Sequence, residues 1–89
     1  MVKIENLEIK EIEKAILRKL AFKPMTIAQV TACMGMSYAT NACILKVWEA
    51  KEWVIHSFKG REGIFSLNKA MFEDYNEDVV KGVILGEIS

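Results

Sequence analysis

The spacing of apolar residues predicts that the chain begins with an amphipathic helix over Leu7 to Phe22. Its apolar residues share one face at intervals of three and four, which is the period of an α-helix. The helix should end before Pro24, because the residue that precedes a proline avoids the helical region of backbone space. The apolar face consists of Ile9, Ile12, Ile16, Leu17 and Leu20.

A short helix, a glycine turn and a longer helix are expected between residues 26 and 51. The short helix covers Thr26 to Met34, with Thr26 as its N-cap. Gly35 can leave that helix with a positive φ, and Ser37 can cap the next one. The longer helix runs from Tyr38 to about Lys51 and places three apolar side chains inside. These are Ile44, Leu45 and Trp48.

A β-hairpin is expected after the longer helix. Residues 53–58 and 64–67 are rich in β-branched and aromatic residues, and a glycine-containing stretch, Lys59 to Gly63, separates them. The turn exposes two cations, Lys59 and Arg61. At the N-terminus, the extended residues Val2 to Ile4 either pair with this hairpin as an edge strand or fray.

A fourth helix is expected over 69–85, with Asn68 as its cap. Its apolar stripe is wider than one side of a small domain normally covers, which favours burial against a second copy of the chain. The interface would consist of Phe72, Tyr75, Val79 and Val83. The alternative is that this helix folds back onto the first helix of its own chain.

Met25 to Leu67 resembles the winged-helix superfamily of small prokaryotic and archaeal transcription regulators. Trp48 and Glu49 stand where these regulators usually have Leu-Glu, late in the recognition helix, and a glycine-tipped wing follows. Glu52 differs from the family pattern, which often has glycine there, and helix 37–51 has fewer cations than is usual. The resemblance implies an α+β winged helix-turn-helix of three helices and a hairpin wing, here with an added C-terminal helix.

The expected core takes residues from the first three helices and from both strands of the hairpin. It consists of Ile12, Ile16, Leu20, Ile27, Val30, Ile44, Leu45, Trp48, Val54 and Phe65.

The start of the second helix of a helix-turn-helix enters the major groove of double-stranded DNA. Ser37, Tyr38, Thr40 and Asn41 would therefore meet base edges and phosphates there, and Asn41 would suit adenine. Lys46 would contact a phosphate on the exposed side of the same helix. In the wing 59–63, Lys59 and Arg61 would contact the DNA backbone or the minor groove.

Charge leaves a second hypothesis open. The segment 37–52 is electrically neutral, so one chain should bind phosphates weakly, whereas a homodimer doubles the contacts. In the alternative, Tyr38 and Asn41 face water and the domain binds a partner protein instead of DNA. The chain is neutral overall, with a basic part over residues 1–68 and an acidic part over 69–89.

Length and composition predict a single ordered domain over residues 1–89. The chain is 52% hydrophobic and 27% charged, which is typical of a globular protein. No apolar run approaches the roughly 18 residues of a membrane-spanning helix, and the N-terminus lacks a signal-peptide core. We therefore expect no membrane association and a cytoplasmic location.

Neither catalysis nor a cofactor is indicated by the sequence. His56 and its neighbour Ser57 would point to opposite faces of a strand, so they cannot act as a base and a nucleophile together. No metal site is expected, because acidic residues 73–78 lack further ligands. No phosphate-binding loop is expected either, because Gly60 and Gly63 lie in a hairpin without the helix and lysine that such a loop needs. Cys33 and Cys43 are expected in the core as reduced thiols, with a redox pair as the alternative.

Overall fold

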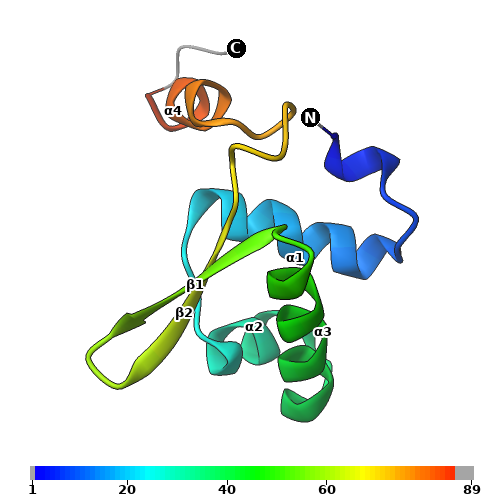
Figure 1. Cartoon of the computed structure of the whole chain (residues 1–89), viewed down its shortest axis with the longest axis vertical. Coiled ribbons are helices and arrows are strands. Elements are labelled where there is room, and N and C mark those ends of the chain that lie inside the picture. The colour runs from blue at the N-terminus through cyan, green and yellow to red at the C-terminus, as the bar shows by residue number, and fades with distance from the viewer. Residues whose placement is uncertain (1, 86–89) are drawn as a thin grey trace.

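A helical body carries a projecting β-hairpin in the computed structural model, which describes residues 2–85 (Figure 1). The elements in chain order are the 3-10 helix η1 (Ile4–Asn6), α1 (Glu11–Phe22), α2 (Ile27–Met34), α3 (Tyr38–Ala50), β1 (Val54–Lys59), β2 (Glu62–Leu67) and α4 (Glu77–Leu85). The helices α1, α2 and α3 form the body, and the hairpin β1–β2 extends from it as the wing (Figure 1). The predicted order of elements is confirmed.

Local capping fixes the helix-turn-helix, as the sequence predicted. The Thr26 Oγ1 accepts a hydrogen bond from the backbone N–H of Gln29 at 3.1 Å, and the Gln29 side chain accepts one from the Thr26 N–H at 2.9 Å. Gly35 has φ 75° and ends α2 in the left-handed conformation. Ser37 then caps α3 by accepting from the Thr40 N–H at 3.1 Å.

The wing has a tighter turn than predicted. Its strands pair antiparallel from Val54 with Leu67 to Lys59 with Glu62, so only Gly60 and Arg61 remain in the turn. Gly60 has φ 65°, which suits the first central position of a two-residue hairpin turn. The five-residue turn expected over Lys59 to Gly63 is therefore wrong, because the ladder continues almost to the tip.

Met25, and not the N-terminal segment, pairs with the outer side of the wing, through a single antiparallel bridge to Phe65. The Met25 N–H donates to the Phe65 carbonyl at 2.9 Å, and the Phe65 N–H donates back at 2.8 Å. Val2 forms a parallel bridge with Phe72 instead. Neither N-terminal alternative that we expected from the sequence is correct.

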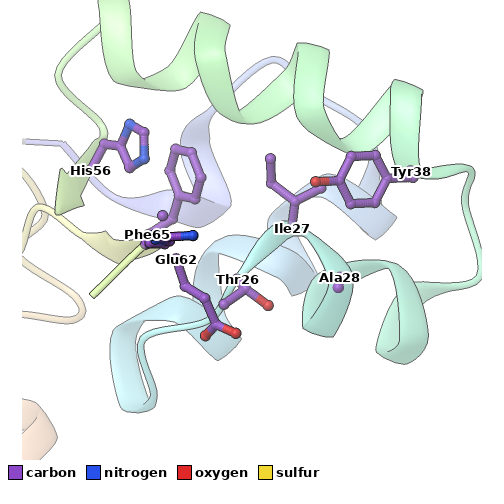
Figure 2. A pocket seen from close by; sticks show the side chains of 9 residues that line it. Thr26, Ile27, Ala28, Tyr38, His56, Glu62 and Phe65 are labelled. Carbon is purple, nitrogen blue, oxygen red and sulfur yellow. The ribbon is translucent and has the colours of Figure 1, made fainter. Parts of the chain in front are cut away.

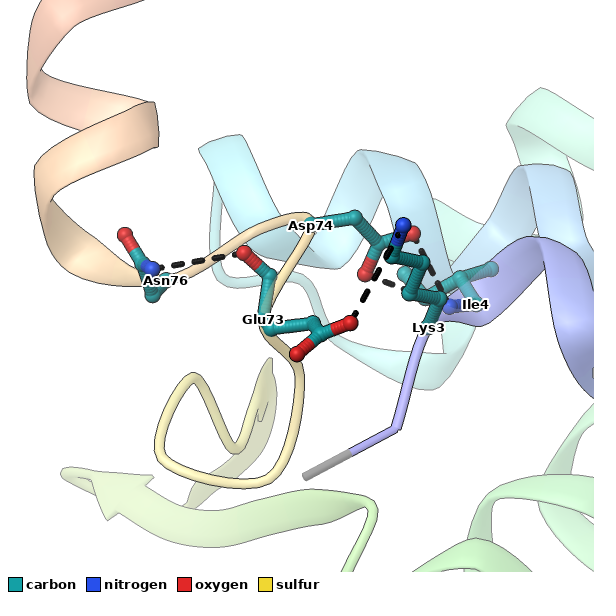
Figure 3. Close-up of polar contacts among 5 residues, drawn as sticks. All are labelled: Lys3, Ile4, Glu73, Asp74 and Asn76. Carbon is teal, nitrogen blue, oxygen red and sulfur yellow. Dashed lines mark hydrogen bonds and ion pairs between the residues drawn. The ribbon is translucent and has the colours of Figure 1, made fainter.

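The N-terminal segment and residues 73–76 hold each other in place (Figure 3). Both carboxylate oxygens of Asp74 accept from the backbone N–H of Ile4, at 3.2 and 3.0 Å, and Ile4 is fully buried. Lys3 Nζ lies 3.9 Å from Glu73 Oε1. These contacts join the N-terminal segment to the connection that precedes α4.

The last helix begins at Glu77 and not at residue 69. The Val2 N–H donates to the Met71 carbonyl and the Val2 carbonyl accepts from the Glu73 N–H, so these backbone groups are unavailable to a helix. Asn76 is the cap, with Oδ1 accepting from the Val79 N–H at 3.0 Å. Asn68, the predicted cap, donates from Nδ2 to the Glu52 carbonyl at 2.9 Å instead.

The first helix also begins later than predicted, at Glu11. Lys10 has an extended backbone with ψ 152° and stands at the N-cap position. Leu7 and Ile9 pack against the core from the connection between η1 and α1. Their apolar spacing resembles a helix, but they belong to a separate segment that covers the core.

Most of the predicted core is buried. Ile16, Leu20, Val30, Leu45, Trp48, Val54 and Phe65 are buried, and Ile27 and Ile44 pack against them while partly exposed. Ile12 is exposed, so its assignment to the core is wrong. The buried hydrophobic residues outside the predicted core are Ile4, Leu17, Ala21, Met25, Leu67, Phe72 and Val80.

Glu52 has a strained backbone conformation between α3 and β1. Its φ is 64°, and it is the only non-glycine residue with positive φ in the described chain 2–85. This is the position where the resembled family often has glycine. Glu52→Gly is expected to raise the free energy of unfolding by about 0.5 to 1 kcal/mol, because glycine adopts this conformation without the left-handed penalty of about 1–2 kcal/mol.

Urea denaturation of Glu52→Gly and of Ala50→Gly tests this expectation. Ala50 ends α3 in helical conformation, so glycine there should lower the free energy of unfolding by up to about 1 kcal/mol. Loss of stability in both variants would show that the conformation at Glu52 costs less than the backbone freedom that glycine adds to the unfolded chain.

Candidate nucleic-acid interface

The beginning of α3 presents hydroxyl groups to solvent. Ser37, Tyr38 and Thr40 are all exposed, and Tyr38 is 57% exposed. The Ser37 hydroxyl donates to the Thr40 Oγ1 at 2.8 Å while it caps the helix, so its own proton is engaged. The Thr40 hydroxyl proton and the Tyr38 hydroxyl remain the groups best placed to donate to an external acceptor.

Asn41 does not belong to this exposed set, which corrects the sequence prediction. It is 1% exposed, and its Nδ2 donates to the Thr31 Oγ1 at 3.0 Å and to the Met36 carbonyl at 3.3 Å. Its side chain therefore fastens α3 to α2 and to the turn between them. Asn41 neither meets a base edge nor faces water.

The outward face of α3 contains residues that sequence reasoning missed. Ala39, Cys43 and Val47 are exposed and share this face at helical spacing with Lys46, which the sequence did predict to be exposed. The predicted burial of Leu45 and Trp48 already implied that Asn41 is buried, because Asn41 lies four and seven residues before them and therefore on the same helical face. The same register turns Cys43 outward.

Few charges on α3 are free to contact a ligand. Glu49 Oε2 lies 3.4 Å from His56 Nδ1, and Lys51 Nζ lies 4.7 Å from the centre of the Trp53 ring. Lys46 is exposed, and the part of the chain described here holds no ion pair that involves it. Lys46 is thus the cation of α3 available to a phosphate.

The wing tip holds two further cations. Lys59 and Arg61 are exposed on either side of Gly60, at the end of the hairpin that is farthest from the helical body (Figure 1). Within the described residues, neither of them forms an ion pair. Both charges are therefore available to an anionic partner.

A concave surface joins the wing to the beginnings of α2 and α3 (Figure 2). It encloses about 310 Å³. Tyr38 lies on one side and His56, Glu62 and Phe65 on the other, with Thr26 and the start of α2 between them (Figure 2). Arg61 also lines this surface from the wing. The hydroxyl end of α3 and the basic tip of the wing thus border one continuous depression.

Comparison with solved structures identifies the arrangement. The structure matches a homodimeric winged helix-turn-helix DNA-binding domain from Mycobacterium bovis, a possible ArsR-family transcriptional regulator, with a TM-score of 0.62 and 18% identity over 89% of this chain and 67% of that one. This chain has the winged helix-turn-helix fold. A probable transcriptional regulator from Pseudomonas aeruginosa matches with a TM-score of 0.67 and 19% identity, over 97% of this chain and 70% of that one.

Lactococcus lactis ZitR shares the same winged-helix fold. It matches with a TM-score of 0.64 and 21% identity, over 92% of this chain but only 53% of the ZitR chain, so this chain spans about half of that structure. No family model and no curated protein matches the sequence. At these identities the comparisons show the fold.

In this winged helix, the burial of one residue in the last segment contradicts its predicted place in a dimer interface. Phe72 is fully buried within its own chain, so its assignment to an interface is wrong. Tyr75 packs edge-on against Phe22 with 5.8 Å between ring centres, and Val79 is partly buried. Val83 lies outside the residues whose side chains are described.

Other chemistry-bearing residues are dispersed over the winged helix. Cys33 and Cys43 are both exposed free thiols, so their expected place in the core is wrong. His56 stacks on Phe65, and Ser57 follows it on the opposite face of β1. Over residues 2–85, no group of three potential metal ligands occurs and no helix is long and apolar enough to cross a membrane.

Proposed function

We propose that this winged helix is a DNA-binding transcriptional regulator that acts as a homodimer. In this proposal α3 enters the major groove, and the wing contacts the backbone or the minor groove beside it. The main support for this proposal is the depression that α3 and the wing share. The Tyr38 end of α3 and the Arg61 end of the wing border it from two sides. One DNA strand that lies along the depression can contact both elements.

The side chains of α3 suit a mixed contact with DNA. Tyr38 and Thr40 offer hydroxyls to base edges or phosphates, and Ser37 fixes the helix end. Lys46 offers a charge to a phosphate. The apolar residues Ala39 and Val47 suit contact with thymine methyl groups.

The solved structures that share the fold support this proposal. The M. bovis domain is named as a possible transcriptional regulator and the P. aeruginosa protein as a probable one, and the M. bovis domain is named as both DNA-binding and homodimeric. A role as a protein-interaction module, the alternative from the sequence, has no observation that favours it. DNA binding needs no catalytic group, and it agrees with the cytoplasmic location expected from the sequence.

A homodimer would compensate for the low charge of each chain. One monomer offers Lys46, Lys59 and Arg61, and two related by a two-fold axis offer twice that number. Tyr75 and Val79, with Val83, remain the proposed contact residues between the chains. Two recognition helices could then reach half-sites about one turn of DNA apart.

Removal of the wing charges should weaken DNA binding and reduce its dependence on salt. Lys59→Ala combined with Arg61→Ala is expected to reduce the slope of log affinity against log salt by about 2 per chain, because each phosphate contact contributes about one counterion. Fluorescence anisotropy with a labelled duplex, measured from about 50 to 200 mM salt, gives the slope.

The matched control is Lys69→Ala combined with Lys81→Ala, which removes the same charge from the region of α4. Lys81 lies on α4, at the opposite end of the molecule from the wing (Figure 1). The control should retain the wild-type slope. Equal slopes for both double variants would contradict the placement of the wing on DNA, and absence of binding at the lowest salt would contradict the proposed function itself.

A further inference from the structure

Phe58 is an aromatic side chain on the wing that the fold does not use. It is 70% exposed, the highest value among the large hydrophobic residues whose side chains are described, which lie within residues 2–81. Its ring centre lies 4.8 Å from that of His56, which in turn stacks on Phe65 at 4.3 Å with an interplanar angle of 10°. The row begins at buried Phe65 and ends in solvent at Phe58.

Gly63 explains why this row can form. Phe58 and Gly63 are paired across the hairpin, so no side chain stands opposite the Phe58 ring. A Cβ on Gly63 would lie 2.5 Å from His56 Nε2, so glycine leaves the space that the imidazole occupies. The imidazole then supports the Phe58 ring from the side of the core, and the rest of the ring is open.

The surroundings of Phe58 suit an anionic polymer. Lys59 follows it directly, and Arg61 lies beyond Gly60 in the turn. Phe58 also shares the face of β1 that carries His56, and His56 lines the depression between the wing and α3. Ile55, which is 50% exposed, lies on the other face of the same strand and lines a separate depression near the start of α4.

We propose that the wing inserts Phe58 as a wedge between base pairs in the minor groove of DNA, with Arg61 bound in the groove beside it. This inference rests on the proposed function. Apolar wedges of this kind unstack a base step and bend the duplex toward the major groove. The preferred sites should contain a flexible step such as TA or CA beside an A·T-rich, narrow minor groove, which attracts arginine.

The test measures DNA bending and affinity together. A duplex with donor and acceptor dyes at its ends, and a TA step at the position of the wing, is titrated with wild type, Phe58→Ala, Phe58→Leu and Ile55→Ala. Wild type is expected to bend the duplex by about 20° or more. Phe58→Ala should abolish the bend and lower the affinity about tenfold, since stacking on one base contributes on that order.

The other two variants separate a wedge from a general surface effect. Leucine also acts as a wedge, so Phe58→Leu should retain a bend. Ile55→Ala removes an exposed apolar side chain from the other face of β1 and should behave as wild type. The salt slope should stay unchanged in Phe58→Ala, because no charge is removed.

Two outcomes would overturn the wedge and leave DNA binding intact. One is tight binding by wild type without a bend. The other is equal affinity and bending for Phe58→Ala and Ile55→Ala; a lower mass of Phe58→Ala by light scattering would then assign Phe58 to a contact between proteins. Absence of binding by wild type, in contrast, contradicts the proposed function itself. Melting temperatures close to wild type confirm that each variant is folded.

Discussion

Trp48→Ala is expected to lower the free energy of unfolding by about 3 to 5 kcal/mol. Trp48 is 3% exposed on the inner face of α3 and lies 6.4 Å, between ring centres, from Trp53 at the start of the wing. Its removal leaves a cavity where α3 joins the wing. A domain of this size has only about 5 to 15 kcal/mol in total, so this single substitution should bring it close to unfolding.

Urea denaturation of Trp48→Ala beside Val47→Ala measures the effect. Val47 comes directly before Trp48 in the sequence but lies on the exposed face of α3. Its truncation should therefore change the free energy of unfolding by less than about 0.5 kcal/mol. A nearly neutral Trp48→Ala, or equal effects in the two variants, would contradict the register assigned to α3.

Phe72→Ala is the second substitution with a large expected effect, again about 3 to 5 kcal/mol of unfolding free energy. Phe72 is fully buried and forms the bridge with Val2, so it joins the N-terminal segment to the connection that precedes α4. The lost free energy should include the contact between the N-terminal segment and Phe72 as well as the cost of the cavity. It should also be the same at every protein concentration, because the side chain packs within its own chain.

Concentration dependence distinguishes this packing from an interface. Val79→Ala serves as the control, since Val79 is only partly buried and remains a proposed dimer contact. Light scattering and urea denaturation at two protein concentrations should show a concentration-dependent effect for Val79→Ala alone. A Phe72→Ala variant that is as stable as wild type but has a lower mass would return Phe72 to the interface.

The elements that could be predicted from the sequence are those that residues close to one another in the sequence determine. Thr26, Gly35 and Ser37 each fix a helix end through bonds or conformations within a few residues, so their roles could be predicted from spacing. The hairpin could be predicted from two apolar runs on either side of a glycine-containing turn. Only the predicted length of the turn was wrong, because pairing up to Lys59 and Glu62 depends on backbone twist.

The errors lie where distant residues decide the structure. The apolar spacing after Asn68 resembled a continuous helix, yet the backbone bonds of Val2 to Met71 and Glu73 prevent one there. Asp74 reaches the N–H of Ile4, a contact between residues seventy positions apart. No local pattern contains such a pairing, so the start of α4 and the burial of Phe72 could not be predicted.

The candidate site shows the same division. Ser37, Tyr38 and Thr40 lie at an exposed helix start, and Lys59 and Arg61 lie at the wing tip, as capping and turn signals indicated. The role expected for Asn41 followed from its residue type, although the helical register placed it inside. The exposure of Phe58 depends on Gly63 across the hairpin, which only the strand register reveals.

Selection of bound sequences from a random duplex DNA pool tests the proposed function most directly. Wild-type protein should enrich a palindromic sequence whose half-sites are separated by about one helical turn, roughly 10 base pairs, and should bind it with two chains per duplex. Major-groove protection should fall within each half-site. Recovery of an unenriched pool at low salt, with no binding to any duplex, would contradict the assignment of α3 and the wing to DNA.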